Sequence, residues 1–463
     1  MSRPITLPGL GLGLLLFLIT SGSGSVKAQD SPEWLDAHRT TAEQFISAAT
    51  ADHTTYDRLA YLTDTFGPRL SGSQSLEDAI DWILSEMEAD GLENVRGEPV
   101  MVPKWVRGQE SLTLLSPRNA DLRMLGLGNS VGTSAEGLTA DVIVVKSFDE
   151  LTRRADEARG RIVLWNVAFT SYGATVQYRT RGAIEAARVG AVGSLLRSVG
   201  PYSMSTPHTG NSAHEEGVPR IPHAAITVED AMMLQRMHDR GQPIRVRLYM
   251  EARHEPDALS RNVVGEIVGS EFPDEVIVLG GHIDSWDVGT GAMDDAGGCV
   301  AAWDALRRMK ELGIRPKRTI RVVMWTNEEN GLRGGNAYRD AHIDELDNHI
   351  LAMESDAGVF KPRGFGFTGS DAAYLTVKSI GTLLNPIESG EVTRGGGGAD
   401  IGPIMALGVP GMGLSVQGER YFWYHHSPAD TIDKLDPDHV NLAVATMGVM
   451  ALTVANLEER LPR

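Results

Sequence analysis

Two largely apolar runs in the C-terminal half constrain the fold more than any other feature of this sequence. They are "EVIVLGG" (275–281) and "TIRVVMWT" (319–326), and apolar residues recur between them at helical spacing from Cys299 to Leu312. A strand that is apolar along its whole length is typical of a sheet with helices on both faces. Strands that alternate with helices predict an α/β architecture. We therefore expect an α/β domain whose central sheet is covered by helices.

A helix and then a glycine-rich middle block precede this half. Apolar residues recur at helical spacing over residues 76–87 and stop near Gly91, which predicts a helix. From about residue 112 to 250, short apolar runs are separated by Gly, Ser and Pro. In this block "GRIVLWN" and "GAVGSLL" predict strands, and "TRGAIEAARVG" predicts a helix between them. We interpret the block as a β-rich insertion.

The length and composition indicate a globular protein of more than one domain. The chain has 463 residues, of which 42% are hydrophobic, and a formal net charge of −18. This acidic balance argues against a nucleic-acid partner, because phosphate backbones select surfaces rich in Lys and Arg. We predict a signal peptide at 1–28, a first part of the α/β domain at 29–115, the inserted domain at 116–254 and the main part of the α/β domain at 255–463.

Two apolar stretches bear on where the protein is found. Arg3 is followed by the apolar run "LGLGLLLFLIT" and then by Val26-Lys27-Ala28, the pattern of a secretory signal with its cleavage site. A retained N-terminal anchor is the alternative. The stretch 440–457 carries no charged residue, but it follows the helix-opening pair Asp436-Pro437, and we interpret it as a buried helix. We expect a secreted or periplasmic protein with no membrane span in the mature chain.

Cysteine chemistry is nearly absent from the sequence. Cys299 is the only cysteine, which excludes an intrachain disulfide and a cysteine-based zinc site. Any metal must therefore bind to His and carboxylate side chains. His208, His214 and His223 in the middle block are scattered, which is typical of surface or hydrogen-bonded core histidines rather than of ligands.

Four segments of the C-terminal half combine acidic residues and histidines just after predicted strands. Each segment alone is weak evidence, since an acidic pair after a strand is usually a solvated turn. Together they place their side chains at the edge of an α/β sheet where ligands bind. The candidate residues are His282, Asp284, Asp294 and Asp295 in the first segment, Glu328 and Glu329 in the second, Glu354 and Asp356 in the third, and His425 and His426 in the fourth.

These residue types favour a particular metal centre. Two histidines and three carboxylates without thiols suit two Zn²⁺ ions that share one bridging carboxylate. Ions paired in this way can activate a water molecule while they polarise a carbonyl group.

Five motifs, taken in order, resemble those of the co-catalytic zinc aminopeptidase and exopeptidase family. They are "GPRLSGS" (67–73), "GGHIDSWDVGTGAMDDAGG" (280–298), "MWTNEENG" (324–331), "MESDAG" (353–358) and "YFWYHHSPADT" (421–431). The resemblance covers essentially the whole mature chain. It implies the zinc exopeptidase fold, a mixed central sheet covered by helices, with a protease-associated-like insertion. It also implies a homodimer.

The resemblance assigns roles to six residues. It makes His282 and Asp356 ligands of one zinc ion, Glu329 and His426 ligands of the other, and Asp294 the bridge between them. Glu328 matches the general base, which takes a proton from the attacking water and delivers it to the leaving amine.

Four further residues are expected around this centre. Asp284 matches a carboxylate that accepts the second ring N–H of His282 and fixes its tautomer. Asp430 is placed to hold His426 from behind. His425 is either a contact for the substrate or its oxyanion, or a structural residue. Asp400, in the loop "TRGGGGAD" (393–400), is either carried to the substrate by a mobile loop or lies in a merely flexible one.

The resemblance makes one backbone prediction and one functional prediction. Family members have a cis peptide at the position of Asp294-Asp295. The function implied is a secreted dinuclear zinc exopeptidase, of the aminopeptidase or dipeptidase type, acting on short peptides with free N-termini. The alternatives are a single-zinc enzyme that cyclises N-terminal glutamine and a non-catalytic binding relative.

Overall fold

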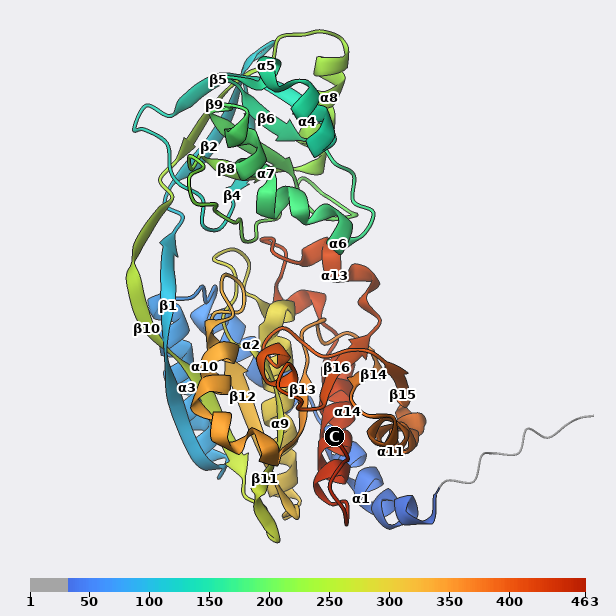
Figure 1. The fold of residues 1–463 in the computed structure, drawn as a ribbon. Helices are drawn as coiled ribbons and strands as arrows, with labels where there is room; N and C mark the ends of the chain where they lie inside the picture. Colours follow the sequence, from blue (N-terminus) through green and yellow to red (C-terminus); the bar gives the residue numbers. More distant parts are fainter. Residues whose placement is uncertain (1–31) are drawn as a thin grey trace, which may run out of the picture.

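The computed structural model describes residues 32–463, so the predicted signal peptide at 1–28 lies outside the described residues. Two eight-stranded sheets organise the chain (Figure 1). The first sheet has the strand order β1-β10-β12-β11-β13-β16-β14-β15. Its strands are β1 (Glu93–Val106), β10 (Arg253–Ile267), β11 (Phe272–His282), β12 (Arg318–Trp325), β13 (His349–Glu354), β14 (Pro362–Thr368), β15 (Glu391–Arg394) and β16 (Gly411–Val416).

The first sheet is mixed, as predicted. Its centre is parallel, since β11 pairs in parallel with β12 and β13, and β13 pairs in parallel with β16. The flanking pairs β1–β10, β10–β12 and β14–β16 are antiparallel. The predicted strands at 275–281 and 319–326 correspond to β11 and β12, and the carboxyl ends of β11, β12 and β13 meet at one edge of the sheet.

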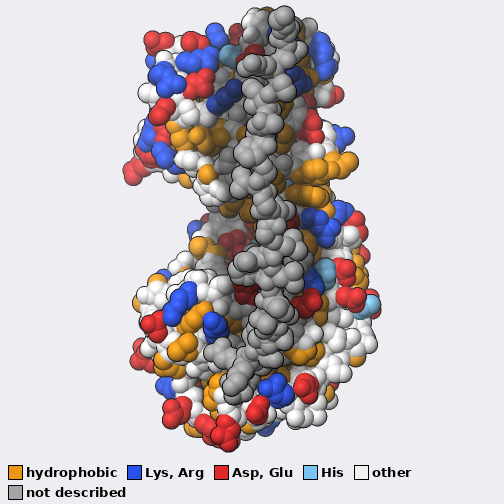
Figure 2. Space-filling model, turned by 90° about the vertical axis from the view of Figure 1, so that its right-hand side faces the viewer, with side chains coloured by type: hydrophobic (Ala, Val, Ile, Leu, Met, Phe, Trp, Pro, Cys, Tyr) orange, Lys and Arg blue, Asp and Glu red, His pale blue; other side chains and the backbone are white. Residues whose placement is uncertain are grey.

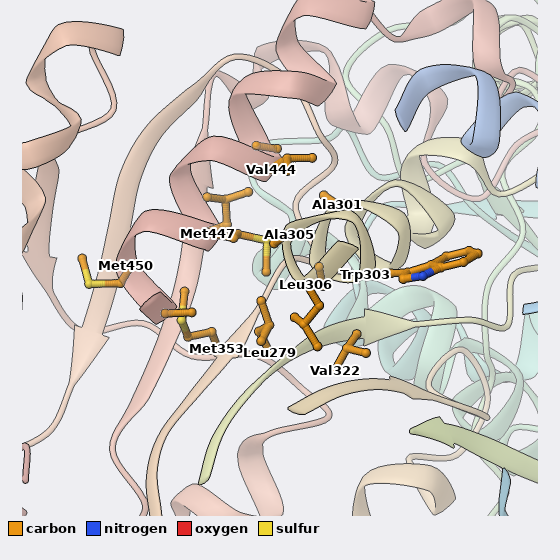
Figure 3. Packing of buried hydrophobic residues seen from close by; sticks show 14 of the residues in the cluster. Leu279, Ala301, Trp303, Ala305, Leu306, Val322, Met353, Val444, Met447 and Met450 are labelled. Carbon is orange, nitrogen blue, oxygen red and sulfur yellow. The ribbon is translucent and has the colours of Figure 1, made fainter. Parts of the chain in front are cut away.

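Helices cover both faces of this sheet, which explains why its central strands are apolar throughout. Ile277 and Leu279 of β11 belong to the main core, whereas Val276 and Val278 belong to a separate cluster on the opposite face. The main core includes residues of α1 (Glu33–Ala49), α2 (Thr54–Phe66), α3 (Gln74–Ala89), α9 (Gly297–Glu311), α11 (Asp371–Gly381) and α14 (Pro437–Ala455). The opposite cluster includes residues of α10 (Arg333–Ala341) and α12 (Gly402–Met405). Figure 3 shows Leu279 and Met353 from the strands close to Met447 of α14.

The apolar C-terminal stretch is a core helix, as predicted. Among the described residues, α14 alone is long and apolar enough to cross a membrane, and 83% of its apolar window is buried inside the protein. Gly448 of this helix allows the Phe45 ring of α1 to pack directly against the backbone, since a Cβ there would lie 2.2 Å from the ring.

The second sheet is formed by the middle of the chain. Its strand order is β3-β2-β9-β5-β6-β7-β8-β4. Its strands are β2 (Glu110–Ser116), β3 (Ala120–Leu122), β4 (Met124–Gly126), β5 (Leu138–Val145), β6 (Ile162–Trp165), β7 (Gly193–Arg197), β8 (His223–Ile226) and β9 (Arg245–Met250). The predicted strands "GRIVLWN" and "GAVGSLL" are β6 and β7, and the predicted helix between them is α7 (Gln177–Arg188).

We call residues 107–252 the inserted lobe and the rest of the described chain the peptidase lobe. The long antiparallel strands β1 and β10 run between the two lobes, paired from Glu93↔Glu266 to Val106↔Arg253 (Figure 1). In Figure 2 the outline of the molecule narrows where the lobes meet. Strand β2 precedes the predicted boundary at residue 116, and the domain boundaries themselves stay predictions.

Candidate active site

The predicted site residues gather at the carboxyl edge of the first sheet, facing the inserted lobe. His282 is the last residue of β11, and Glu328 and Glu329 lie in the turn that follows β12. Asp356 follows β13, and His426 follows the short helix α13 (Tyr421–Tyr424). Parallel strands place their carboxyl ends together, so side chains that are far apart in sequence become neighbours.

Asp294 lies at the centre of this group. Its Oδ1 is 3.2 Å from Nε2 of His282, and its Oδ2 is 3.4 Å from Nε2 of His426. Oδ2 is buried and has no hydrogen-bond partner among the described residues. The Asp294-Asp295 peptide is cis, as predicted. The carboxylate of Asp295 lies within 4.8 Å of ligand atoms of His282 and Asp356, but it already accepts the backbone N–H of His282 and of Gly298.

Two sets of donor atoms converge on Asp294. On one side Nε2 of His282 is 3.4 Å from Oδ1 of Asp356. On the other side Nε2 of His426 is 2.9 Å from Oε2 of Glu329. A tetrahedral zinc ion with bonds of about 2.0–2.2 Å holds its ligand atoms about 3.3–3.6 Å apart, a spacing that His282 and Asp356 have, whereas the 2.9 Å between His426 and Glu329 is a hydrogen-bond distance. The chemistry of the donors, imidazole and carboxylate, suits the same ion.

The tautomer of His282 also suits a metal ligand. The atom of Asp284 that accepts the ring N–H, and so fixes this tautomer, differs from the prediction. Nδ1 of His282 lies 2.8 Å from the backbone oxygen of Asp284 and donates to it, which leaves Nε2 facing Asp294. The carboxylate of Asp284, predicted to accept this N–H, is 3.7 Å away. It instead accepts the backbone N–H groups of Glu328 at 3.0 Å and Glu329 at 3.3 Å. Asp284 therefore shapes the turn that presents both glutamates.

Glu328 lies on the wall of a cavity of about 320 Å³. The cavity is lined by Tyr172, Arg179, Asp294, Glu328, Glu329, Asp356, Tyr421, Phe422, His425 and His426. Burial, together with the nearby carboxylates of Asp356 and Asp284, raises the pKa of Glu328 to about 8. Glu329 also lines the cavity, but its Oε2 lies 2.9 Å from Nε2 of His426, whereas Glu328 forms no ion pair with a histidine among the described residues.

The inserted lobe holds the two histidines at the end of the chain. Thr209 donates its backbone N–H to the oxygen of His426 at 2.8 Å, and Nδ1 of His208 donates to the oxygen of His425 at 2.7 Å. Burial lowers the pKa of His208 to about 4, which fits the predicted hydrogen-bonded core histidine. Burial also lowers the pKa values of His425 and His426 well below their usual value, so both rings are neutral. Neutral imidazole is the form that binds metals.

Two residues of the inserted lobe reach the cavity and were not predicted. Nη1 of Arg179 in α7 lies 3.2 Å from Nδ1 of His426, and its Nη2 donates to the hydroxyl of Tyr172 at 2.7 Å. The ring of Tyr172, in α6 (Tyr172–Thr175), stacks on Phe422 at 5.0 Å between centroids. Nothing in the local sequence marks either residue, because both act across the junction of the lobes.

The comparisons with known proteins agree with this geometry. Residues 262–451 match the model of Peptidase family M28. The chain is 51% identical to carboxypeptidase Q of Bos taurus over 89% of this chain and 88% of the relative, and 50% identical to that of Homo sapiens over the same shares. The chain belongs to peptidase family M28. The predicted resemblance to the zinc exopeptidase family and the predicted class of enzyme, a zinc metallopeptidase, are thereby confirmed.

Solved M28 structures agree with the fold. A peptidase M28 precursor from Shewanella amazonensis SB2B superimposes with a TM-score of 0.89 at 35% identity, covering 93% of this chain and 99% of that one. A zinc aminopeptidase from Bacillus subtilis has a TM-score of 0.67 at 19% identity and covers 88% and 96%, which shows the fold alone. The predicted zinc exopeptidase fold is confirmed.

Two predicted neighbours of the M28 site lie elsewhere. Asp430 does not hold His426; its carboxylate accepts the backbone N–H of Met293 at 2.8 Å and of Asp294 at 3.2 Å. Burial near Asp294 raises the pKa of Asp430 to about 7. The prediction was wrong because the backbone N–H groups before Asp294 are buried and need an acceptor, whereas Nδ1 of His426 already contacts Arg179.

Asp400 is not among the residues that line the cavity, and its contact with the substrate stays a prediction. Its side chain is 1% exposed and lies behind Glu354. The glycines before it explain the placement: a Cβ on Gly398 would lie 2.0 Å from the carboxylate carbon of Glu354, so only glycine allows the loop to pack there. The backbone N–H of Ile401 then donates to Glu354 at 2.9 Å.

Proposed function

We propose that this protein is a dinuclear zinc exopeptidase that removes the first residue from short peptides with free N-termini. Asp294 carries the proposal, because its two carboxylate oxygens face two separate donor sets. His282 and Asp356 would hold one ion, Glu329 and His426 the other, and Asp294 both. Bound zinc ions supply Lewis acidity, which lowers the pKa of a water molecule and polarises the peptide carbonyl.

Glu328 performs the proton transfer in this proposal. It lies on the cavity wall beside the donor sets and pairs with none of their histidines. Its raised pKa makes it a better proton acceptor than an ordinary carboxylate, so it takes the proton of the attacking water and returns it to the leaving amine. The backbone bonds to Asp284 keep Glu328 in place.

His425 and the acidic wall position the substrate. Nε2 of His425 lies 3.6 Å from Oδ2 of Asp294, and its ring stacks on that of His426 at 3.5 Å. We assign to His425 the contact with the carbonyl oxygen, which gains negative charge during attack. Glu328 is the lining carboxylate that this proposal leaves unbound to a metal ion, so it also faces the positively charged N-terminus.

Two further parts of the proposal concern the whole chain. The secretory pattern at 1–28 supports export, to the periplasm or outside the cell. We also propose a homodimer, and size-exclusion chromatography with light scattering tests it: a mass of one chain contradicts that part.

Hydrolysis of free and N-acetylated dipeptides by the purified protein tests the function. We expect cleavage of the free dipeptides only, and a fall in kcat/KM of about 10²–10⁴-fold in Glu328→Gln with the zinc content unchanged. A protein that cleaves no free dipeptide, or that keeps full activity in Glu328→Gln, would contradict the proposal. Release of ammonia from peptides with N-terminal glutamine would instead indicate the cyclase.

A further inference from the structure

The segment "GPRLSGS" (67–73) connects helices α2 and α3 and lines no part of the candidate active-site cavity. Its arginine, Arg69, is nevertheless 0% exposed and contacts the loop at residues 283–291. This loop, which we call the linking loop, leads from His282 at the end of β11 to the helical turn that carries Asp294. Burying a charge is costly unless it is well paired, so a cation buried against the connection between two proposed ligands indicates a specific role.

The guanidinium of Arg69 donates hydrogen bonds to four backbone carbonyl groups. Nε donates to Ile283 at 2.9 Å, at the start of the linking loop. Nη1 donates to Thr290 at 2.7 Å and Nη2 donates to Gly291 at 3.0 Å, at the end of the loop. Nη1 also donates to Gly67 at 2.9 Å, which fixes the guanidinium to its own segment. One side chain therefore holds the two ends of the linking loop together.

The backbone of Arg69 binds the linking loop at a third place. Its N–H donates to Oγ of Ser285 at 3.0 Å, and its carbonyl accepts the N–H of Ser285 at 3.1 Å. The loop contains no helix or strand, and Ile283–Trp286 and Gly291 are buried, so the carbonyls there need donors from outside the loop. Only arginine offers five N–H groups in a fixed fork, which lets one side chain bind three carbonyls of the loop at once.

Asp430 holds the same stretch of chain from the opposite side and with the opposite charge. Its backbone oxygen accepts the N–H of Thr290 at 2.7 Å, and its carboxylate accepts the N–H groups of Met293 and Asp294. Arg69 thus binds the carbonyls that precede the turn, and Asp430 binds the N–H groups within it. Hydrogen bonds to charged groups are about twice as strong as those between neutral groups, so the pair fixes the backbone on both sides of the turn.

Ser71 extends the segment 67–73 to the turn that carries the two glutamates. Its Oγ donates to Oδ2 of Asp284 at 3.2 Å and accepts from Nδ2 of Asn327 at 3.1 Å. The carboxylate of Asp284 in turn accepts the backbone N–H groups of both glutamates. One segment that contributes no proposed ligand therefore contacts the connections that carry four of the five.

We propose that Arg69 is the positioning residue of the shared carboxylate: it holds Asp294 opposite His282 and thereby sets the affinity of the site for zinc. This inference rests on the proposed function, in which the two residues share an ion. Nε2 of His282 and Oδ1 of Asp294 are 3.2 Å apart across 12 positions of sequence, so the conformation of the linking loop decides whether they meet. Without Arg69 the loop would have to be ordered when the metal binds, and that cost in entropy would reduce the affinity.

Zinc titration of the metal-free protein against a competing chelator tests the inference without turnover. We expect the zinc affinity of Arg69→Met to be about 10- to 100-fold lower than that of the wild type. Arg69→Lys should lie between them, because an ammonium group keeps the charge and three N–H groups but lacks the fixed fork. Wild-type affinity in Arg69→Met would overturn the inference and leave the proposed exopeptidase standing. A wild-type protein that binds no zinc would contradict the proposed function itself.

Arg318→Met is the matched control for the loss of a buried arginine. Arg318 is 2% exposed and also donates to backbone carbonyls, those of Ala455 and Leu457. It is the first residue of β12, at the opposite end of that strand from the glutamate turn. Both methionine variants should have a lower Tm than the wild type, but only Arg69→Met should lose zinc affinity. An equal loss of affinity in the two would show a general effect of destabilisation and would overturn the inference.

Kinetics at saturating zinc and the absorption of the Co²⁺-loaded protein give two further readouts. Arg69 does not line the cavity, so we expect kcat for a free dipeptide such as Ala-Gly to fall about 100-fold in Arg69→Met with KM nearly unchanged. The d–d absorption of Co²⁺, which reports the geometry of its ligands, should change in Arg69→Met and stay as in the wild type in Arg318→Met. A raised KM with an unchanged kcat would contradict a role through the metal centre.

Arg69→Lys decides the question where Arg69→Met yields no folded protein. Its zinc affinity, its kcat and its Co²⁺ spectrum are compared with those of the wild type and of Arg318→Met, and its Tm is measured on the same samples. A decrease in zinc affinity and kcat with an altered spectrum supports the inference. Wild-type values in all three assays would overturn it.

Discussion

At the residue scale, two adjacent aspartates have opposite surroundings. Asp294 faces the donor sets, whereas Asp295 is enclosed by glycines: a Cβ on Gly281 would lie 2.0 Å from its Oδ2, and a Cβ on Gly298 would lie 2.5 Å from its Oδ1. The glycines around the pair allow the sheet and helix α9 to close over Asp295. Asp294 is the one of the pair that lines the cavity.

Asp284→Asn tests how the glutamate turn is held. The carboxylate of Asp284 accepts two backbone N–H groups and the hydroxyl of Ser71 at 3.2 Å. An amide has one acceptor oxygen, so its NH₂ group would face a buried N–H donor. We expect a loss of about 1–3 kcal/mol of stability and a decrease of about 10- to 100-fold in zinc affinity or activity. Urea unfolding and a zinc titration measure both. Wild-type values in each assay would contradict this role.

Glu328→Gln should separate stability from activity. Because the pKa of Glu328 is raised to about 8, the charged form of this side chain is disfavoured in the metal-free fold. The free energy of unfolding therefore decreases as the pH rises through that value. The neutral amide removes this cost. We expect the metal-free variant to have a Tm at least equal to that of the metal-free wild type at pH 8.5. A clearly lower Tm would show that the charge of Glu328 stabilises the fold.

At the element scale, helix α14 depends on one glycine. A side chain at Gly448 would enter the space of the Phe45 ring, so we expect Gly448→Leu to cost about 1–3 kcal/mol or more by overpacking. Gly402→Ala is the control, because a Cβ there meets nothing within 4 Å. Urea unfolding compares the two variants. A Gly448→Leu protein as stable as the control would contradict the close packing of α1 on α14.

The elements of the fold could be predicted from the sequence, because their signals are local. Strands β11 and β12 are largely apolar, and apolar residues of α3 and α9 recur at helical spacing, so each prediction needed only its own segment. The donor residues could be placed for the same reason: they follow those strands directly. The family resemblance supplied the roles.

The contacts between elements could not be predicted in the same way. Arg179 contacts His426 across 247 positions of sequence, and no period or motif connects them. The acceptor for the ring of His282 is the carbonyl of Asp284 instead of its carboxylate, a choice between two atoms of one residue. The packing of the loop before Asp400 could not be predicted either: four glycines predict a free loop, whereas here Gly398 packs closely on Glu354.

At the scale of the whole molecule, the active site belongs to both lobes. The peptidase lobe supplies the donor sets, and the inserted lobe holds the backbone of His425 and His426 and contributes Arg179. The cavity is therefore lined by residues of both lobes. In the proposed function, metal binding and substrate recognition would depend on the two histidines whose backbone the inserted lobe holds.

Removing the metal should destabilise the protein more at higher pH. In the metal-free fold the pKa values of Glu328 and Glu354 are raised to about 8, against about 4.3 in an unfolded chain. The folded state then binds more protons, so stability is lost as the pH rises from about 4 through 8. The lowered pKa values of His425 and His426 act oppositely, but only as the pH falls through about 6.5.

We therefore expect chelation to lower Tm by about 5 °C or more, and by more at pH 8.5 than at pH 6.5. Scanning calorimetry with and without a chelator at both values measures the effect, and added zinc should reverse it. An unchanged Tm on chelation, or an equal decrease at both pH values, would contradict the account.

The most direct test of the central claim is an anomalous diffraction measurement at the zinc edge on crystals of the zinc-loaded protein. The account predicts two peaks about 3.5–4 Å apart, one beside His282 and Asp356 and one beside Glu329 and His426, with Asp294 in contact with both. A single peak, or two peaks of which either lies out of reach of Asp294, would contradict the shared carboxylate on which the proposed mechanism depends.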